Sequence, residues 1–160
     1  MLQVDRLYEA VAEKSPVCVG LDTDFSYIPA ECVDKTLSKG ENIFRFNRDI
    51  IEATRSVAGC FKVQIAYYEM YGVEGMKTFA ETLAYASKKG MYVMTDAKRN
   101  DIGATATAYA EAYLGKTRVG DTEIAPYGCD SVTVNGYLGT DGVEPFLKEC
   151  RNREKSLFML

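Results

Sequence analysis

The sequence predicts an α/β fold whose strands form a parallel sheet, and three observations support this. Short apolar runs of strand length alternate with longer segments of helical periodicity along the 160 residues. No internal repeat, linker or low-complexity segment interrupts the alternation. Polar residues also stand at or near the carboxyl ends of four runs, at Asp22, Lys62, Asp96 and Asn135. Strands that alternate with helices in this way are typical of right-handed βαβ units.

Two architectures share this pattern. One is a doubly wound open sheet, and the other is a (β/α)₈ TIM barrel that is cut short. Active sites gather at the carboxyl ends of the strands in both folds. Many strands that each contribute one polar residue are typical of the barrel, so the pattern favours a barrel without deciding the question.

The first two helices and strands follow one another in order. Residues 2–14 have helical spacing, and their apolar residues lie on one side, namely Leu2, Leu7 and Val11. Residues 16–21, PVCVGL, form an apolar run of strand length. Residues 41–57 again show helical spacing, and residues 60–65, CFKVQI, form the second predicted strand.

The remaining elements continue the alternation. A helix is predicted over residues 73–89, because two lysines in its last turn and Gly90 beyond it are helix-stop signals. The elements after it are a strand at 91–96, an alanine-rich helix at about 102–114, a strand at 131–134, a helix around 141–150 and a strand at 157–160.

Composition excludes several classes of protein. The net charge of -4 and the scattered lysines and arginines predict no nucleic-acid partner. The five cysteines contain no C-x-x-C pair, so we expect neither a disulfide framework nor a zinc site, and we expect a reducing compartment, the cytoplasm. The amino terminus is amphipathic rather than signal-like, and no run approaches 18 apolar residues, so no membrane span is expected.

The sequence contains no histidine, which removes much of the usual catalytic repertoire. Ser-His-Asp triads, Cys-His pairs and HExxH zinc sites are impossible. Acid–base chemistry must therefore come from Asp, Glu, Lys, Tyr or Cys. Walker A and G-x-G-x-x-G motifs are also absent, and we expect neither a cofactor nor a metal.

The densest cluster of polar residues leaves the third predicted strand, over residues 96–102, DAKRNDI. Asp96 and Lys98 are two positions apart, so on an extended backbone their side chains share a face. The structural interpretation is that Asp101 caps the next helix and that the rest is a solvated loop. The bare D-x-K-x-x-D pattern, taken alone, favours that interpretation.

Lys62 strengthens the functional interpretation. It lies within the apolar run FKVQI, where a lysine needs a partner or a route to water, such as an edge position. Asp22 follows the apolar run VCVGL and is either a turn residue or part of the same site. Two strands that each bring a lysine beside a carboxylate favour a functional site.

The segment 95–106, TDAKRNDIGATA, resembles the signature of orotidine 5'-phosphate decarboxylases, most closely that of the longer bacterial and archaeal subfamily. Further matches follow in order at VGLDTD (19–24), FKVQIAYYE (61–69) and SVTVNGYLGTDGVEPF (131–146). The resemblance implies a (β/α)₈ TIM barrel that converts orotidine 5'-phosphate to UMP and CO₂ in de novo pyrimidine biosynthesis without a cofactor. The family barrel continues into strands that carry a phosphate-binding loop. We therefore expect residues 1–160 to be a single partial barrel domain, truncated after about five strands and lacking the C-terminal strands.

The resemblance also implies roles for individual residues. Lys98 would donate a proton to C6 of the pyrimidine, and Asp96 would lie against the substrate carboxylate. Lys62 and Asp101 would complete an alternating Lys-Asp-Lys-Asp array. Asp22 and Lys62 would also bind the ribose hydroxyls.

In dimers of this family the neighbouring subunit supplies the equivalents of Asp101 and Thr105, so a homodimer is expected. Two alternatives remain. One is a magnesium-dependent sugar-phosphate decarboxylase of the same superfamily, such as one acting on a 3-keto-gulonate phosphate, although the Ile102-Gly103-x-Thr105 continuation argues against it. The other is a non-catalytic fragment that binds partners through an open sheet edge.

Overall fold

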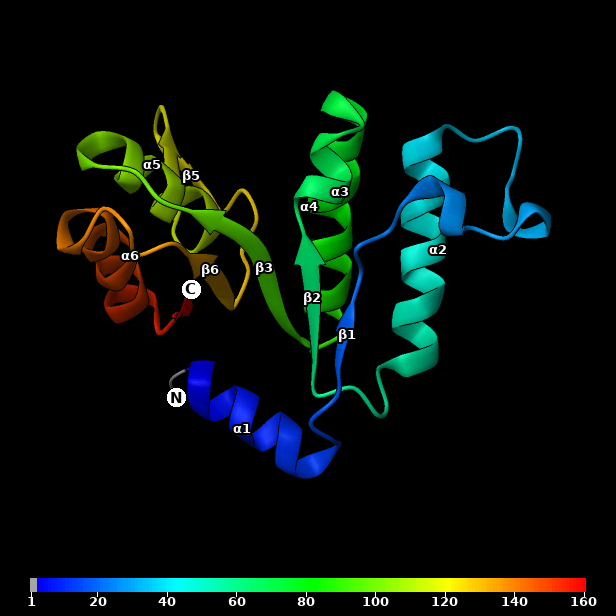
Figure 1. Cartoon of the computed structure of the whole chain (residues 1–160), viewed down its shortest axis with the longest axis horizontal. Coiled ribbons are helices and arrows are strands. Elements are labelled where there is room, and N and C mark those ends of the chain that lie inside the picture. Colours follow the sequence, from blue (N-terminus) through cyan, green and yellow to red (C-terminus); the bar gives the residue numbers. More distant parts are fainter. Residues whose placement is uncertain (1–2) are drawn as a thin grey trace.

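Five parallel strands form the main sheet of the computed structural model, which describes residues 3–160 (Figure 1). Their order in the sheet is their order in the chain: β1 (Cys18–Gly20), β2 (Cys60–Gln64), β3 (Tyr92–Arg99), β6 (Ser131–Val134) and β7 (Ser156–Met159). All neighbouring pairs are parallel. The five strands expected from the sequence are therefore confirmed, with some shifted bounds.

The order of the strands decides between the two predicted architectures. Four long helices lie in the connections between successive strands of the sheet. They are α2 (Lys39–Thr54), α4 (Gly72–Lys88), α5 (Gly103–Tyr113) and α6 (Thr140–Arg153). Buried residues of all four belong to one apolar cluster, together with strand residues such as Phe61, Val93 and Val132. A doubly wound sheet reverses its strand order at a switch point, and this sheet does not. The unreversed order is that of a (β/α) barrel.

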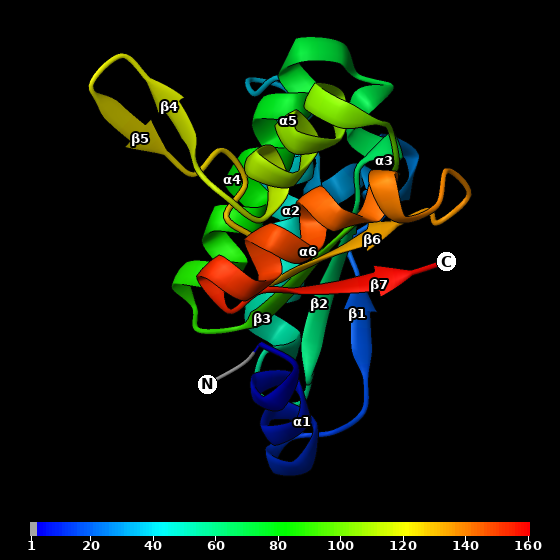
Figure 2. The ribbon, with the colours of Figure 1, turned by 90° about the vertical axis from the view of Figure 1, so that its left-hand side faces the viewer.

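Helix α1 (Gln3–Glu13) lies across one end of the sheet and not beside it (Figure 2). Its Arg6 guanidinium donates a hydrogen bond to Oδ1 of Asp130, just before β6, at 3.0 Å. The helix thus covers the amino ends of the strands and leaves their carboxyl ends free. The predicted helix over 2–14 is confirmed, except that Leu2 lies outside the described residues.

Local signals explain where helices begin and end. Ser38 caps α2, since its Oγ accepts from the Glu41 N–H at 3.2 Å and the Glu41 carboxylate accepts from the Ser38 N–H at 2.8 Å. This capping box starts the helix at Lys39, ahead of the expected start at 41. After α4, Gly90 has a φ of 76°, the left-handed conformation that commonly follows a helix end. None of the helices between residues 3 and 160 has both the length and the apolar character needed to cross a bilayer.

A β-hairpin between α5 and β6 was not predicted. Its strands β4 (Thr117–Val119) and β5 (Thr122–Ile124) form a separate antiparallel sheet that projects from the main body (Figure 2). The turn is Gly120-Asp121, with a φ of 61° at Gly120, and glycine at the first turn position is typical of type II′ hairpins. The other unpredicted elements are short, namely α3 (Ala66–Glu69) and the 3₁₀ helices η1 (Phe25–Tyr27) and η2 (Ala30–Cys32).

Candidate active site

Four charged side chains meet at the carboxyl ends of β1, β2 and β3. The Lys62 Nζ atom donates to both carboxylate oxygens of Asp22 at 2.9 Å. The same ammonium lies 3.6 Å from Oδ2 of Asp96. On the other side of Asp96, Lys98 Nζ donates to Oδ1 at 2.6 Å. The charges alternate along Asp22, Lys62, Asp96 and Lys98, which we call the charged array.

The alternation of side chains along β2 explains why a lysine lies here. Phe61 and Val63 are buried in the apolar cluster, whereas Lys62 and Gln64 point to the opposite face and are partly exposed. β2 pairs with β1 on one side and with β3 on the other. The interpretation of Lys62 as an edge residue is therefore wrong, and its charge is matched by carboxylates at the strand ends.

Burial and ion pairing act against each other in the array. Burial disfavours the charge of Lys62, but its hydrogen bond to Asp22 and the two neighbouring carboxylates raise the pKa of Lys62 above its ordinary value. Asp96 is only 8% exposed. Burial acts to raise the pKa of Asp96, but hydrogen bonds from Lys98 and Thr133 outweigh it and lower that pKa. Both groups are thus held in their charged forms at neutral pH.

Two residues that the sequence analysis did not single out complete the surroundings of Asp96. Thr133 Oγ1 donates to Oδ1 at 2.8 Å, and Gln64 Nε2 donates to Oδ2 at 3.0 Å. Gln64 could have been found, because it follows Lys62 by two positions on the same strand face. Thr133 had no such signal, since it stands in the run SVTV, where a β-branched residue suits a strand in any case.

Strand β3 carries Lys98 on an irregular backbone. The strand runs to Arg99, beyond the predicted end at residue 96, and its pairing with β6 shifts between Thr95 and Arg99. Lys98 has a φ of 50°, which is unfavourable for a residue with a side chain. Asp96 and Lys98 therefore meet as expected, but the reason given, a uniformly extended backbone, is wrong. The Lys98 side chain is 48% exposed, so its ammonium is open to a ligand.

Asp101 and Thr105 do not join the array of their own chain within residues 3–160. Asp101 Oδ1 accepts from the adjacent Ile102 N–H at 2.8 Å, and Ile102 itself occupies the N-cap position of α5. The interpretation of Asp101 as the N-cap is therefore wrong. Thr105 is exposed in the first turn of α5. Asn135, the other polar residue at a strand end, accepts from the Tyr137 N–H in its own loop at 2.8 Å.

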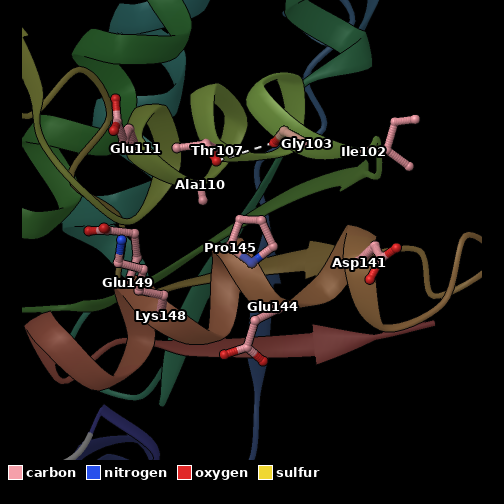
Figure 3. A pocket seen from close by; sticks show the side chains of 10 residues that line it. All are labelled: Ile102, Gly103, Thr107, Ala110, Glu111, Asp141, Glu144, Pro145, Lys148 and Glu149. Carbon is pink, nitrogen blue, oxygen red and sulfur yellow. Dashed lines mark hydrogen bonds between the residues drawn. The ribbon is translucent and has the colours of Figure 1, made fainter.

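A cleft of about 580 Å³ opens between α5 and α6 (Figure 3). Its lining includes the apolar residues Ile102, Ala110 and Pro145 and the acidic residues Glu111 and Asp141. No member of the charged array lines it. The cleft is a surface between two neighbouring helices, whereas the charged array occupies the strand ends, and we therefore take the array as the candidate active site.

The array has the chemistry of a general acid that needs no histidine. The Lys98 ammonium can donate a proton, and its charge can stabilise negative charge that develops on a bound molecule. Asp22 and Lys62 offer an acceptor and a donor side by side, which suits binding of hydroxyl groups. Asp96 lies between the two lysines and fixes the positions of both.

Comparisons with known proteins identify the family of the chain. Residues 15–160 match the family model described as Orotidine 5'-phosphate decarboxylase / HUMPS family. The orotidine 5'-phosphate decarboxylase of Clostridium novyi (strain NT) is 46% identical over 160 residues, which are 100% of this chain and 53% of that protein. The enzyme of the same name from Clostridium botulinum (strain Loch Maree / Type A3) is 46% identical over 157 residues, which are 98% of this chain and 52% of that protein.

Solved structures show the same similarity. A Streptomyces avermitilis protein assigned as an orotidine 5'-phosphate decarboxylase superposes with a TM-score of 0.81 at 34% identity, over 99% of this chain and 52% of its own. The OMP decarboxylase of Leishmania donovani gives a TM-score of 0.75 at 27% identity, over 99% of this chain and 53% of its own. Together with the five-stranded parallel sheet, these matches confirm the expected (β/α)₈ TIM barrel fold, truncated after about five strands.

The matches cover this chain more completely than they cover its relatives. The chain spans about half the length of the curated relatives it matches, although nearly all of its own residues are covered. All four residues of the charged array lie inside the region matched by the family model. The chain therefore belongs to the orotidine 5'-phosphate decarboxylase / HUMPS family.

Proposed function

We propose that this protein provides the catalytic array of an orotidine 5'-phosphate decarboxylase, a cofactor-free carboxy-lyase that forms UMP and CO₂ in de novo pyrimidine biosynthesis. The observation that carries the proposal is the contact of 2.6 Å between Lys98 Nζ and Asp96 Oδ1 inside an alternating array of charges. The array lies at the carboxyl ends of the strands, where (β/α) barrels hold their active sites. We assign the enzyme to the cytoplasm, the reducing compartment that its scattered cysteines favour.

In the proposed reaction, Lys98 is the proton donor. The bond between C6 of the pyrimidine and the carboxylate carbon breaks, CO₂ leaves, and the electron pair remains on C6. The ammonium of Lys98 stabilises this charge and transfers a proton to C6, which leaves a neutral amine. One preorganised donor of this kind typically contributes about 3–4 kcal/mol to the transition state.

The other members of the array assist this step. Asp96 aims the Lys98 ammonium, and its negative charge lies against the substrate carboxylate, which adds ground-state destabilisation until CO₂ leaves. Lys62 and Asp22 bind the ribose hydroxyls, a role supported by their partial exposure of 27% and 35%. Binding the ribose fixes the pyrimidine relative to Lys98.

A homodimer is the second part of the proposal, in which Asp101 and Thr105 reach the array of the partner. Two features of the chain support it. Neither residue contacts the array of its own chain within the described residues 3–160. Ile102, which lies between them in sequence, exposes 59% of its surface beside the cleft of α5 and α6. An exposed large apolar side chain beside a groove suits an interface.

Purified protein would test the proposal and its two alternatives. We would measure UMP formation from orotidine 5'-phosphate by the 160-residue chain and by a chimera. The chimera joins this chain to the part of the Clostridium novyi relative that the chain does not match. We expect the chimera to form UMP at the same rate with and without EDTA. The chain alone should be much slower, because the family resemblance places the phosphate-binding loop in the part that only the chimera has. Binding energy from the substrate phosphate, although it is distant from C6, also drives the chemical step.

Each alternative gives a different result in this experiment. UMP formation that EDTA abolishes would contradict the cofactor-free reaction. Decarboxylation of a 3-keto-gulonate phosphate that EDTA abolishes, without UMP formation from orotidine 5'-phosphate, would indicate the metal-dependent sugar-phosphate decarboxylase and would contradict the proposal. UMP formation by neither protein, despite a folded chimera, would favour a non-enzymatic fragment that binds partners through the edges of its sheet.

A further inference from the structure

The Thr133 hydroxyl is a centre of contacts between β6 and β3. It is 6% exposed and lies within β6. Its Oγ1 accepts from the Ala97 N–H at 3.0 Å and from the Lys98 N–H at 2.9 Å. It also donates to Oδ1 of Asp96 at 2.8 Å. One buried hydroxyl therefore contacts three consecutive residues of β3.

These contacts fix the direction of the hydroxyl proton. A threonine hydroxyl has one hydrogen to donate and two lone pairs to accept with. The N–H groups of Ala97 and Lys98 occupy both lone pairs, so the single hydrogen of Thr133 must point at Asp96. The oxygen that receives it must be an acceptor, which favours the ionised form of Asp96.

The same contacts support the irregular backbone of β3. Thr95 pairs with Val132 and Arg99 pairs with Val134, so three residues of β3 face the single residue Thr133. Within this bulge Lys98 has a φ of 50°, a conformation that costs about 1–2 kcal/mol for a residue with a side chain. A backbone bulge of this kind re-aims a side chain. Here it directs Lys98 back over Asp96.

We propose that Thr133 is a positioning residue, whose hydroxyl holds Lys98 in its bulged backbone and Asp96 in its charged form. Its relevance to catalysis rests on the proposed decarboxylase function, but the positioning itself does not. If Thr133 only filled space in the sheet, valine would replace it without effect, because valine has the same shape. The proposal instead assigns the effect to the hydroxyl oxygen.

The test compares Thr133→Val with Thr133→Ser in the 160-residue chain by NMR. We would titrate the Asp96 carboxyl carbon and record the Lys98 Cα and Cβ shifts, which report its left-handed backbone. Thr133→Val should raise the Asp96 titration midpoint and move the Lys98 shifts toward extended values, whereas Thr133→Ser should keep both. Thr95→Val is the matched control, because Thr95 is also a buried threonine and its hydroxyl makes no hydrogen bond to Asp96 or Lys98.

Unchanged Asp96 titration and Lys98 shifts in Thr133→Val would overturn the proposal. If that variant does not fold, the wild-type chain still decides: its Thr133 hydroxyl proton should exchange slowly with water at neutral pH, and rapid exchange would overturn the proposal as well. In the chimera, kcat for orotidine 5'-phosphate should fall on the order of tenfold or more in Thr133→Val and recover in Thr133→Ser. A chimera without activity whose chain shows the expected NMR shifts would reject the decarboxylase function and leave the positioning role intact.

Discussion

Replacing Asp96 with asparagine removes the central charge of the array and keeps the shape of the side chain. The Asn oxygen can still accept from Thr133, and its amide nitrogen would take the place of the oxygen that now accepts from Gln64 Nε2. Lys98 would lose the carboxylate at 2.6 Å, while Lys62 would keep its partner Asp22. We therefore expect Asp96→Asn to destabilise the fold.

The exposure of the two lysines sets the size of this loss. Removing one member of a fully buried ion pair costs about 3–5 kcal/mol. Here the side chains of Lys98 and Lys62 are 48% and 27% exposed. Water can therefore solvate each ammonium and replace part of the interaction energy that is lost with the carboxylate. The loss should be closer to that of hydrogen bonds to a charged group, about 1.5–3 kcal/mol.

The loss should also depend on pH. The folded-state pKa of Asp96 is lowered, so its charge stabilises the fold above the unfolded carboxyl pKa of about 3.9. This stabilisation is lost as the pH falls through the lower, folded pKa. The difference between wild type and Asp96→Asn should therefore be largest near neutral pH and should shrink in acid.

Urea unfolding of the 160-residue chain, followed by far-UV circular dichroism, measures both effects. Asp49→Asn is the matched control, because Asp49 is 60% exposed in its surface pair with Arg48. This control should change the free energy of unfolding by less than about 0.5 kcal/mol. An Asp96→Asn chain as stable as wild type at pH 7, or a difference that persists unchanged in acid, would refute the reasoning.

Three further predictions follow from the same structure. Asp101→Ala should change the free energy of unfolding by less than about 0.5 kcal/mol, since Asp101 is not the helix cap. If Asp101 and Lys98 act across a dimer, mixing the inactive Asp101→Ala and Lys98→Ala chimeras should restore activity in up to about one pocket in four. Gly75→Ala should cost about 3 kcal/mol in urea unfolding, because a Cβ there collides with the carbonyl of Tyr68. Ser38→Ala should cost about 1 kcal/mol in the same assay, since it removes the cap of α2, and no change would contradict the capping box.

Much of the fold could be predicted from the sequence because its strands are short apolar runs between amphipathic helices. The pattern could not separate a barrel from a doubly wound sheet, since both use the same βαβ units. Strand order made that decision, and order is a long-range property. The hairpin at 117–124 was missed because each of its strands has only three residues and little apolar periodicity.

The candidate site was only partly predictable. Lys62 could be recognised because a lysine inside an apolar strand needs a partner, and the structure supplies Asp22 and Asp96. The bulge at Lys98 was not foreseeable, because it depends on a register shift against a strand more than 30 residues further along the chain. Thr133 was missed for the same reason, since its role comes from tertiary contacts and not from local sequence.

The most direct test of the central claim is the kcat of the Lys98→Ala chimera with orotidine 5'-phosphate. Lys77→Ala is the matched control, because Lys77 is an exposed lysine on α4 that pairs at the surface with Glu81, 3.8 Å away. We expect Lys98→Ala to form no detectable UMP while remaining folded, since the Lys98 side chain lies at the open strand ends and its loss leaves no core cavity. Lys77→Ala should turn over at the wild-type rate. A folded Lys98→Ala chimera with unchanged kcat would contradict the assignment of Lys98 as the proton donor.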